Sequence, residues 1–344
     1  MSAPRLAHFC WIGPKLPWAY AIALLSAAAR GEADEVILHH TDELENGPAL
    51  EALRAVSTIR LAWINPKILL DSVGAELGLD GGLWAIYNRI SSPAILSDIL
   101  RAAILYRDGG IYLDVDTVTV GSFSPLFELP QFIGVERIVW PYWVKSSRSP
   151  LVWGRTLTLD LLRKAMRLLP EGWRFYLHIE GWYFRGINGA IMGGAPKAPL
   201  FEVYLRQMVA MPADKQIKPN ALGPDLLQEL IGKGAIRDLV IFDPQYFYPI
   251  APEISEHWFR PCRNAPQALT EVLTPQTIVV HWYGSVRTKS YVAKIDPEYI
   301  QEHRQSQLYS ALVAEVLPEL SEIRHGDDKK VSRQKPSDVC VGGG

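Results

Sequence analysis

The sequence predicts an α/β protein in which helices flank a central sheet. Three observations carry this prediction: apolar strands alternate with helices over the first 65 residues, a Gly-Gly pair joins a long helix to a strand, and two aspartates follow that strand. Alternation of this kind predicts parallel strands with helices on both faces. Open sheets of this class bind their ligands at the carboxyl ends of the strands. The two aspartates therefore mark the place where a site is expected.

The elements of the chain follow from its apolar runs and its turn residues. Residues 6–12 form an apolar run that ends at a Gly-Pro turn, and residues 35–41 and 59–65 form two more, with helices expected at 17–30 and 48–55. Later segments predict strands at 132–139, 187–194, 239–242, 246–250 and 277–282, and helices at 198–211, 226–231 and 296–317.

The central helix is expected to begin after Ser92 and to end at Gly109. Ser92 is a favourable N-cap, and Pro93 fits the first helical position. Apolar residues recur at helical spacing along this segment, so one broad face is buried. Gly109 and Gly110 end the helix, where a positive φ angle is expected.

Four charged residues belong to this helix and to the strand that follows it. Asp98 and Arg101 lie three residues apart and share a helix face. Strand alternation places Asp114 and Asp116 on one side, together with Tyr112. Two like charges at such spacing repel each other, and a divalent cation with oxygen ligands relieves the repulsion. The alternative for an isolated Asp-x-Asp is a solvated turn.

Length, composition and charge set further bounds. The 344 residues carry a formal charge of −2, which gives no indication of nucleic-acid binding. Three widely spaced cysteines favour a reducing compartment. The sequence shows neither a signal-peptide pattern nor an apolar run long enough to cross a bilayer. We therefore expect a cytoplasmic protein with one domain over residues 1–323 and a disordered polar tail over 324–344.

The central stretch resembles a known sequence pattern. The matching residues are Ser97, Asp98, Arg101, Gly109, Gly110, Tyr112, Asp114 and Asp116. Their spacing is similar to that of the DXD-containing, family 32-like sugar transferases, which include yeast-type initiating mannosyltransferases, bacterial capsule and lipooligosaccharide transferases, and the glucosylating domains of clostridial toxins. The resemblance implies a GT-A fold, with a Rossmann-like mixed central sheet and a helical, aromatic-rich insertion.

The same resemblance implies an activity. The protein would transfer a sugar from a nucleotide-sugar donor to a glycan or glycolipid acceptor in polysaccharide or glycolipid assembly. A UDP-sugar is favoured as the donor, with a GDP-sugar as the alternative. Mn²⁺ or Mg²⁺ would assist the transfer. Retention of the anomeric configuration is implied, by front-face attack; double displacement stays an alternative, because the sequence supplies no assured nucleophile.

Donor-binding residues also follow from the resemblance. Asp98, Arg101 and Asp114 would hold the ribose and the donor sugar. Trp11 and Gly13, at the end of the first strand, would approach the nucleotide base. For Trp11 the alternative is core packing, and for Gly13 it is the turn itself.

Further candidates lie in the second half of the chain. Asn188 would reach the donor sugar or the reaction centre, and Asp225 is the weaker catalytic candidate beside Asp114 and Asp116. Their alternatives are a turn residue and a helix N-terminal carboxylate. His281 would be a third metal ligand beside Asp114 and Asp116, the alternative being a structural histidine. Ser285 and Lys289 would cover the diphosphate as part of a polar loop.

Residues 138–186 form an aromatic and basic segment. They contain five of the eleven tryptophans, interleaved with arginine and lysine. Tryptophan and tyrosine suit both carbohydrate stacking and membrane interfaces, and basic residues suit anionic lipid. The hypothesis is an acceptor side with peripheral membrane contact. The alternative is a small helical subdomain in which the aromatic residues only pack.

Two rival functions remain at this point. A carbohydrate-binding protein with the same fold but without turnover is disfavoured by the complete set of Asp98, Arg101, Asp114 and Asp116. A nucleotidyltransferase that makes a nucleotide sugar would usually carry a glycine-rich basic loop after the first strand. The turn at Gly13 lacks that density of glycine.

Overall fold

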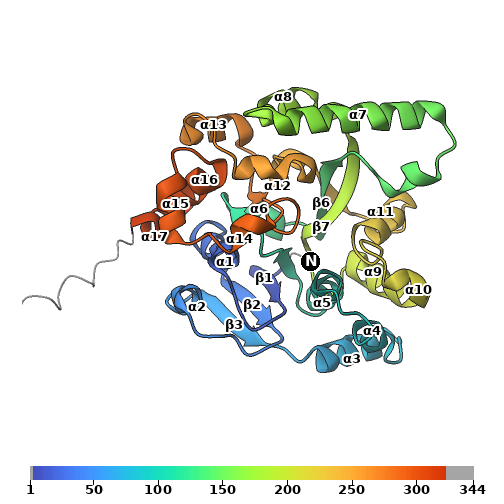
Figure 1. Ribbon diagram of the computed structural model, residues 1–344. Coiled ribbons are helices and arrows are strands. Elements are labelled where there is room, and N and C mark those ends of the chain that lie inside the picture. Colours follow the sequence, from blue (N-terminus) through green and yellow to red (C-terminus); the bar gives the residue numbers. More distant parts are fainter. Residues whose placement is uncertain (1–2, 323–344) are drawn as a thin grey trace, which may run out of the picture.

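A seven-stranded mixed sheet forms the centre of the molecule (Figure 1). The structure is a computed structural model that describes residues 3–322. The sheet strands are β1 (Leu6–Trp11), β2 (Glu35–His40), β3 (Ile59–Trp63), β4 (Gly110–Leu113), β6 (Gln131–Ile138), β7 (Phe184–Gly194) and β8 (Val240–Phe242), in the order β3-β2-β1-β4-β7-β6-β8. A second, two-stranded sheet pairs β5 (Thr117–Thr119) with β9 (Val279–His281). The predicted α/β fold is confirmed.

Strand direction changes at β7. Strands β3, β2, β1 and β4 are parallel, whereas β7 is antiparallel to both β4 and β6. Strand β8 is parallel to β6. The carboxyl ends of β1 and β4 consequently lie at the same edge of the sheet, and the two aspartates come directly after β4.

Helices cover both faces of the sheet. One face carries α1 (Trp18–Arg30) and α2 (Pro48–Arg54), whose apolar residues join Ala7 and Phe9 in one core. The opposite face carries α3 (Pro66–Glu76), α4 (Gly82–Tyr87), α5 (Pro93–Asp108), α9 (Pro199–Ala210) and α11 (Pro224–Gly232). Cys10 and Tyr112 pack into that second core. Alternate residues of β1 thus enter different cores, as the pleat requires.

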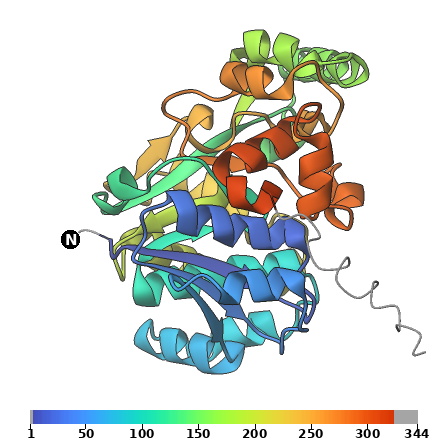
Figure 2. The ribbon, with the colours of Figure 1, turned by 90° about the vertical axis from the view of Figure 1, so that its left-hand side faces the viewer.

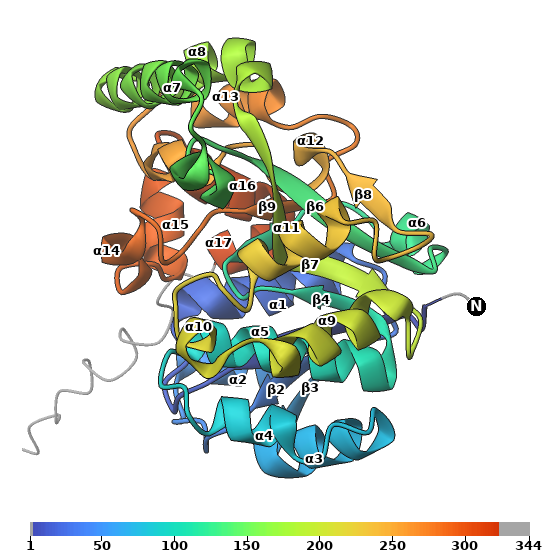
Figure 3. The ribbon, with the colours of Figure 1, turned by 90° about the vertical axis from the view of Figure 1, so that its right-hand side faces the viewer.

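A third core lies above the sheet in the orientation of the figures. It joins α7 (Pro150–Leu168), α8 (Gly172–Ile179), η3 (Pro252–Trp258), α13 (Ala265–Val272), α15 (Pro297–His303), α16 (Leu308–Val316) and α17 (Pro318–Glu322). Figures 2 and 3 show α7 and α8 at the top, at the opposite end from α3. Short elements complete the chain: α6 (Ser124–Phe127), η1 (Tyr142–Ser146), η2 (Glu180–Trp182), α10 (Ala213–Gln216), α12 (Pro244–Phe247) and α14 (Lys289–Val292).

The Gly-Gly turn brings β4 against β1, as predicted. Gly109 and Gly110 have φ angles of 68° and 89°, which side chains rarely adopt. A Cβ on Gly110 would also lie 2.6 Å from the carbonyl oxygen of Leu6. Both positions therefore require glycine. Ser92 occupies the N-cap of α5, as predicted, although its side chain makes no capping hydrogen bond.

Two predicted elements are wrong. Residues 246–250 are not a strand, because Pro244 begins the short helix α12 and the N–H of Tyr248 donates to the Pro244 carbonyl at 2.6 Å. Residues 296–317 are not one helix, because the chain breaks between α15 and α16. The carbonyls of Gln305 and Ser306 accept hydrogen bonds from the 262–265 loop and so are not available to continue a helix.

The remaining predictions concern membrane-spanning segments, the cysteines and the C-terminal tail. None of the helices within residues 3–322 has both the length and the apolar character needed to cross a membrane. Cys10 and Cys262 are free thiols, while Cys340 lies outside the described residues. The predicted disordered tail, 324–344, also lies outside them.

Candidate donor and metal site

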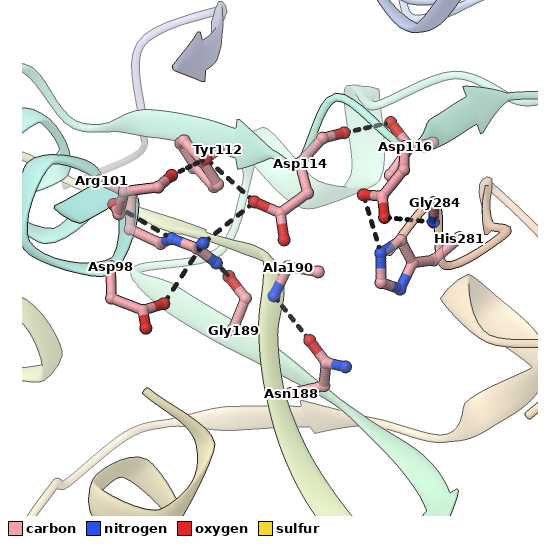
Figure 4. A network of polar contacts seen from close by, with 12 residues as sticks. Asp98, Arg101, Tyr112, Asp114, Asp116, Asn188, Gly189, Ala190, His281 and Gly284 are labelled. Carbon is pink, nitrogen blue, oxygen red and sulfur yellow. Dashed lines mark hydrogen bonds and ion pairs between the residues drawn. The ribbon is translucent and has the colours of Figure 1, made fainter. Parts of the chain in front are cut away.

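Arg101 links the central helix to the strand end. Its guanidinium Nη2 lies 3.2 Å from Asp98 and 3.0 Å from Asp114, and its Nη1 donates to the carbonyl of Gly189 at 2.6 Å (Figure 4). The Arg101 side chain is only 7% exposed. A buried charge of this kind is stable only when it is paired and hydrogen-bonded. Arg101 therefore fixes the positions of both carboxylates.

Tyr112 completes the support of Asp114. Its hydroxyl donates to Oδ1 of Asp114 at 3.0 Å and lies 3.0 Å from the hydroxyl of Ser97. The Arg101 guanidinium lies over the Tyr112 ring, 4.7 Å from its centre. Tyr112 and Asp114 thus lie on the same side of the strand, as the alternation predicted.

Asp116 is held by the end of β9, far along the chain. The Nε2 atom of His281 lies 3.0 Å from Oδ1 of Asp116, and the backbone N–H of Gly284 donates to Oδ2 at 2.7 Å (Figure 4). The N–H of Trp282 donates to the Asp116 carbonyl. Pairing of Thr117 with His281 in the β5–β9 sheet sets this alignment.

Asp114, Asp116 and His281 fit a divalent cation. One carboxylate oxygen from each aspartate and one imidazole nitrogen lie within 4.8 Å of one another. Carboxylates suit Mg²⁺ and Mn²⁺, and imidazole is a ligand of transition metals. The Nε2 atom of His281 is hydrogen-bonded to Asp116, whereas its Nδ1 atom is buried without a hydrogen-bond partner, so one nitrogen of the ring has no contact with a protein polar group.

Burial and charge separate the pKa values of these three groups. Burial raises the pKa of Asp114, against the opposing effect of Arg101. Burial acts in the same direction on Asp116, but the charge and hydrogen bond of His281 hold its pKa below the usual value. Burial lowers the pKa of His281, yet the neighbouring Asp116 outweighs it and leaves that pKa raised. Asp116 is thus the carboxylate most firmly held in its ionised form.

Two cavities meet at the cluster. They share Ala94, Arg101, Asp114, Asp116 and Ser285 in their walls. The first, of about 350 Å³, has a remaining lining that is aromatic or apolar except for Ser97; the other residues are Cys10, Trp11, Ile12, Tyr20, Pro93, Tyr112 and Val115. The second, of about 380 Å³, is more polar, and its remaining lining includes Asp98, Glu136, Asn188, Asp225, Gln228, Glu253, His281 and Tyr283.

Most predicted site residues line one of the two cavities. Trp11 lines the first and packs against Tyr20 in a tilted arrangement, with ring centres 5.1 Å apart. Asn188 and Asp225 line the second, and Oδ1 of Asn188 accepts from the N–H of Ala190 at 2.7 Å. Burial raises the pKa of Asp225.

Gly13 and Lys289 lie outside both linings. Gly13 has a φ angle of 119°, as its turn requires, and its N–H donates to Asp42 at 2.9 Å. Lys289 is exposed and begins α14. The structure therefore places the lysine at the end of the predicted loop, in the short helix α14, and not against the cluster.

Glu136 is a site residue that the sequence reasoning missed. It lies on β6, is 8% exposed and lines the second cavity. The Tyr283 hydroxyl donates to its Oε2 at 2.8 Å. Burial raises the pKa of Glu136 to about 7, against the hydrogen bonds from Tyr283 and Asn188. The signal in the sequence was a glutamate within an apolar strand, because charged residues are rarely buried unless they are paired.

Comparison with known families identifies the central region. Residues 78–133 match the family model described as "Glycosyltransferase sugar-binding region containing DXD motif". The chain carries the sugar-binding region of the DXD glycosyltransferases. The resemblance expected from Asp98, Arg101, Asp114 and Asp116 is therefore confirmed, since all four lie within the matched region. No curated protein sequence matches the chain.

Solved glycosyltransferase structures are similar to the chain at low sequence identity. The PaToxG glycosyltransferase is 16% identical, with a TM-score of 0.40 over 68% of this chain and 70% of that one. The UDP-bound glycosyltransferase domain of the YGT toxin is 9% identical, with a TM-score of 0.39 over 70% and 79%. The galactosyltransferase LgtC, in complex with donor and acceptor sugar analogues, is 13% identical, with a TM-score of 0.39 over 90% and 95%.

Proposed function

We propose that the chain is a metal-dependent glycosyltransferase. It transfers a hexosyl group from a nucleotide sugar, UDP-linked rather than GDP-linked, to a hydroxyl of a glycan or glycolipid, with retention of configuration. The observation that carries the proposal is the cluster of Asp114, Asp116 and His281 at the junction of two cavities. A diphosphate bridging nucleoside and sugar has its charge in the middle, where this cluster lies.

The two cavities suit the two halves of such a donor. Trp11, Tyr20 and Pro93 give the first cavity apolar walls for a nucleobase, and Ser97 offers a hydroxyl for the ribose. The second cavity carries the polar residues Glu136 and Asn188, as a sugar-binding site requires. The donor sugar and the acceptor hydroxyl would meet there.

Three residues of the cluster would hold a cation that assists departure of the diphosphate. Asp114, Asp116 and His281 would hold Mn²⁺ or Mg²⁺, which supplies positive charge for the diphosphate as its bond to the sugar breaks. The imidazole in the ligand set favours Mn²⁺ over Mg²⁺. Arg101 acts through Asp98 and Asp114, because its guanidinium is occupied by these carboxylates and by the Gly189 carbonyl.

The transfer exchanges one bond at the anomeric carbon for another. The bond to the diphosphate oxygen breaks, a bond to the acceptor oxygen forms, and the acceptor proton passes to the leaving diphosphate. Asn188 would hold the donor sugar, and Asp225 would position the acceptor from the wall of the second cavity. Ser285 already lines both cavities. Lys289 would reach the diphosphate only if the 283–290 loop moved toward the cluster.

Release of nucleoside diphosphate tests the proposal. The purified chain is incubated with a panel of UDP- and GDP-sugars in Mn²⁺, in Mg²⁺ and in chelator. We expect release from at least one donor, faster with Mn²⁺ than with Mg²⁺ and suppressed by chelator. No release from any donor would favour a catalytically silent binding protein. Pyrophosphate release from a nucleoside triphosphate and a sugar phosphate would favour a nucleotidyltransferase.

A further inference from the structure

Exposed apolar side chains gather on one part of the molecule. Ten of the fifteen large hydrophobic residues that are exposed among the described residues lie within 142–182. They are Tyr142, Trp143, Leu151, Trp153, Leu157, Leu161, Leu168, Leu169, Phe175 and Trp182. Soluble proteins rarely concentrate exposed apolar surface in this way unless it contacts a partner or a membrane.

Helix α7 turns three of its leucines outward along one side. Leu157, Leu161 and Leu168 are 55%, 69% and 80% exposed. At 100° per residue they fall within about 40° of one another around the helix axis, and they form what we call the leucine face. The opposite side of the helix is buried: Leu159 and Met166 pack into the third core, and Arg163 pairs with Asp160 at 2.5 Å and with Glu253 at 2.7 Å. The helix thus has a buried side of its own, and its outward side is apolar as well, where a helix surrounded by water normally carries polar residues.

Aromatic packing alone does not account for the segment. Trp173 and Tyr176 are buried in the third core, as the alternative to membrane contact required. Trp143, Trp153 and Trp182 are 39%, 36% and 60% exposed, however. Exposed tryptophan beside an apolar helix face is typical of segments that lie in a membrane interface.

The basic residues of the segment indicate that it would bind an anionic surface. Residues 138–186 contain eight lysines and arginines but three aspartates and glutamates, a formal net charge of +5, although the whole chain carries −2. Four of the eight basic residues pair with carboxylates outside the segment: Arg163, Arg167, Arg174 and Arg185. Lys145 and Arg148 are exposed and form no ion pair within residues 3–322. Lys164 is 59% exposed and lies on α7 beside the leucine face.

We propose that the leucine face, together with the exposed tryptophans and with Lys145 and Arg148, binds the surface of an anionic lipid bilayer. The apolar side chains would enter the interfacial region, and the basic side chains would contact acidic headgroups. Figures 1 and 3 show that α7 lies along the outer edge of the molecule, where a flat surface can reach it.

The second cavity extends toward the same segment. Trp140, Pro141 and Tyr142 belong to its lining, and Tyr142 is among the exposed residues of the segment. Binding would therefore bring the polar cavity close to the headgroups, within reach of an acceptor that is anchored in lipid. This last step rests on the proposed function, whereas membrane binding itself does not.

A second copy of the chain is the main alternative occupant. A two-fold contact through the leucine face presents the same surface from both copies. The carboxylates of Asp160 and Glu171 in this segment already pair with Arg163, Lys164 and Arg174, so they do not offer Lys145 and Arg148 of a second copy a free partner. Acidic headgroups offer such partners, and the charge therefore favours an anionic surface over a dimer.

Vesicle flotation tests the proposal. The full chain is floated with vesicles of phosphatidylcholine and phosphatidylglycerol, or of phosphatidylcholine alone, at low and high salt. We expect flotation with the anionic vesicles at low salt and at least about tenfold less with neutral vesicles or at high salt. Absence of flotation with anionic vesicles, or equal flotation with both kinds, would overturn the proposal.

Two variants locate the binding surface. The triple variant Leu157→Ser, Leu161→Ser and Leu168→Ser is expected to lose at least about tenfold in vesicle affinity, because each leucine loses its apolar burial in the bilayer. The matched control replaces exposed apolar residues elsewhere, Ile68→Ser and Ile217→Ser, and should float like the wild type. Equal flotation of the triple variant would contradict the assignment.

The charge variant keeps the leucines and so guards against misfolding as an explanation. The double substitution Lys145→Gln and Arg148→Gln should weaken binding to anionic vesicles about fivefold for each charge removed. Thermal unfolding of every variant checks the fold. A chain that does not float but forms dimers through the leucine face in sedimentation would refute the membrane proposal. Because flotation needs no turnover, its failure is distinguishable from a failure of the proposed transfer reaction.

Discussion

The imidazole Nε2 of His281 lies 3.0 Å from Oδ1 of Asp116, although 165 positions separate the two residues. The pairing of β5 with β9 brings them together. The N–H of Gly284 holds the other oxygen of the same carboxylate. Asp116 is therefore oriented from both sides by the chain itself.

Replacement of His281 should weaken the metal site. His281→Asn removes the imidazole, one nitrogen of which lies within 4.8 Å of an oxygen of each carboxylate. We therefore expect the affinity for Mn²⁺ to fall about 100-fold. Calorimetric titration of Mn²⁺ measures this directly. His303→Asn, on α15 outside both cavities, is the matched control and should bind Mn²⁺ like the wild type. Unchanged affinity of His281→Asn would remove His281 from the ligand set.

Arg101 and Tyr112 support the same carboxylate but should differ in importance. Arg101→Ala leaves Asp98 and Asp114 buried without their partner, which is expected to cost about 3–5 kcal/mol of unfolding free energy. Tyr112→Phe removes one hydrogen bond to Asp114 and is expected to cost about 1 kcal/mol. Denaturant unfolding measures both. Similar losses in the two variants would contradict the central role of Arg101.

Glu136 should give the protein a pH-dependent stability. Burial raises its pKa from 4.5 to about 7, so the folded state binds a proton more tightly than the unfolded state does. The stabilisation is fully present below pH 4.5 and is lost as the pH rises through 7, a change of about 3 kcal/mol. Relative to the wild type, Glu136→Gln should lack this decline.

Denaturant unfolding from pH 4 to pH 8 checks that expectation. The matched control is Glu128→Gln, because Glu128 is exposed. Its profile should follow that of the wild type. An equal decline in Glu136→Gln and in the wild type would show that Glu136 ionises as an ordinary glutamate.

Gly284 should not tolerate a side chain. A Cβ there would lie 2.9 Å from the buried Trp282 ring and 3.1 Å from Cβ of Asp116. Gly284→Ala is therefore expected to displace the N–H that holds Asp116 and to slow nucleoside diphosphate release about tenfold to 100-fold. Gly232→Ala, where a Cβ meets open space, is the control for the assay. A wild-type rate in Gly284→Ala would mean that this hydrogen bond has no role in turnover.

Local sequence was sufficient to predict the first part of the site. The helix face of Asp98 and Arg101, the Gly-Gly stop and the side of the strand that carries Tyr112 and Asp114 all depend on neighbouring residues, and the structure shows each of them. Local periodicity also predicted most strands. It failed where distant segments take the backbone hydrogen bonds, as between α15 and α16.

Glu136 could not be assigned from local sequence. Its environment is made by Tyr283 and Asn188, which lie on other elements, and only the folded chain brings them to β6. The same limit applies to Lys289. The loop was predicted, but whether its lysine reaches the cluster depends on how α14 packs, and here Lys289 is outside both cavities.

Metal-dependent release of nucleoside diphosphate by the Asp116→Asn variant tests the central claim most directly. The assay uses the donor on which the wild type is fastest, in Mn²⁺, with Asp71→Asn on α3 as the matched control. We predict that Asp116→Asn loses about 100-fold to 1000-fold in rate, because the carboxylate that anchors the cation is gone, while Asp71→Asn retains the wild-type rate. A wild-type rate in Asp116→Asn would contradict the account.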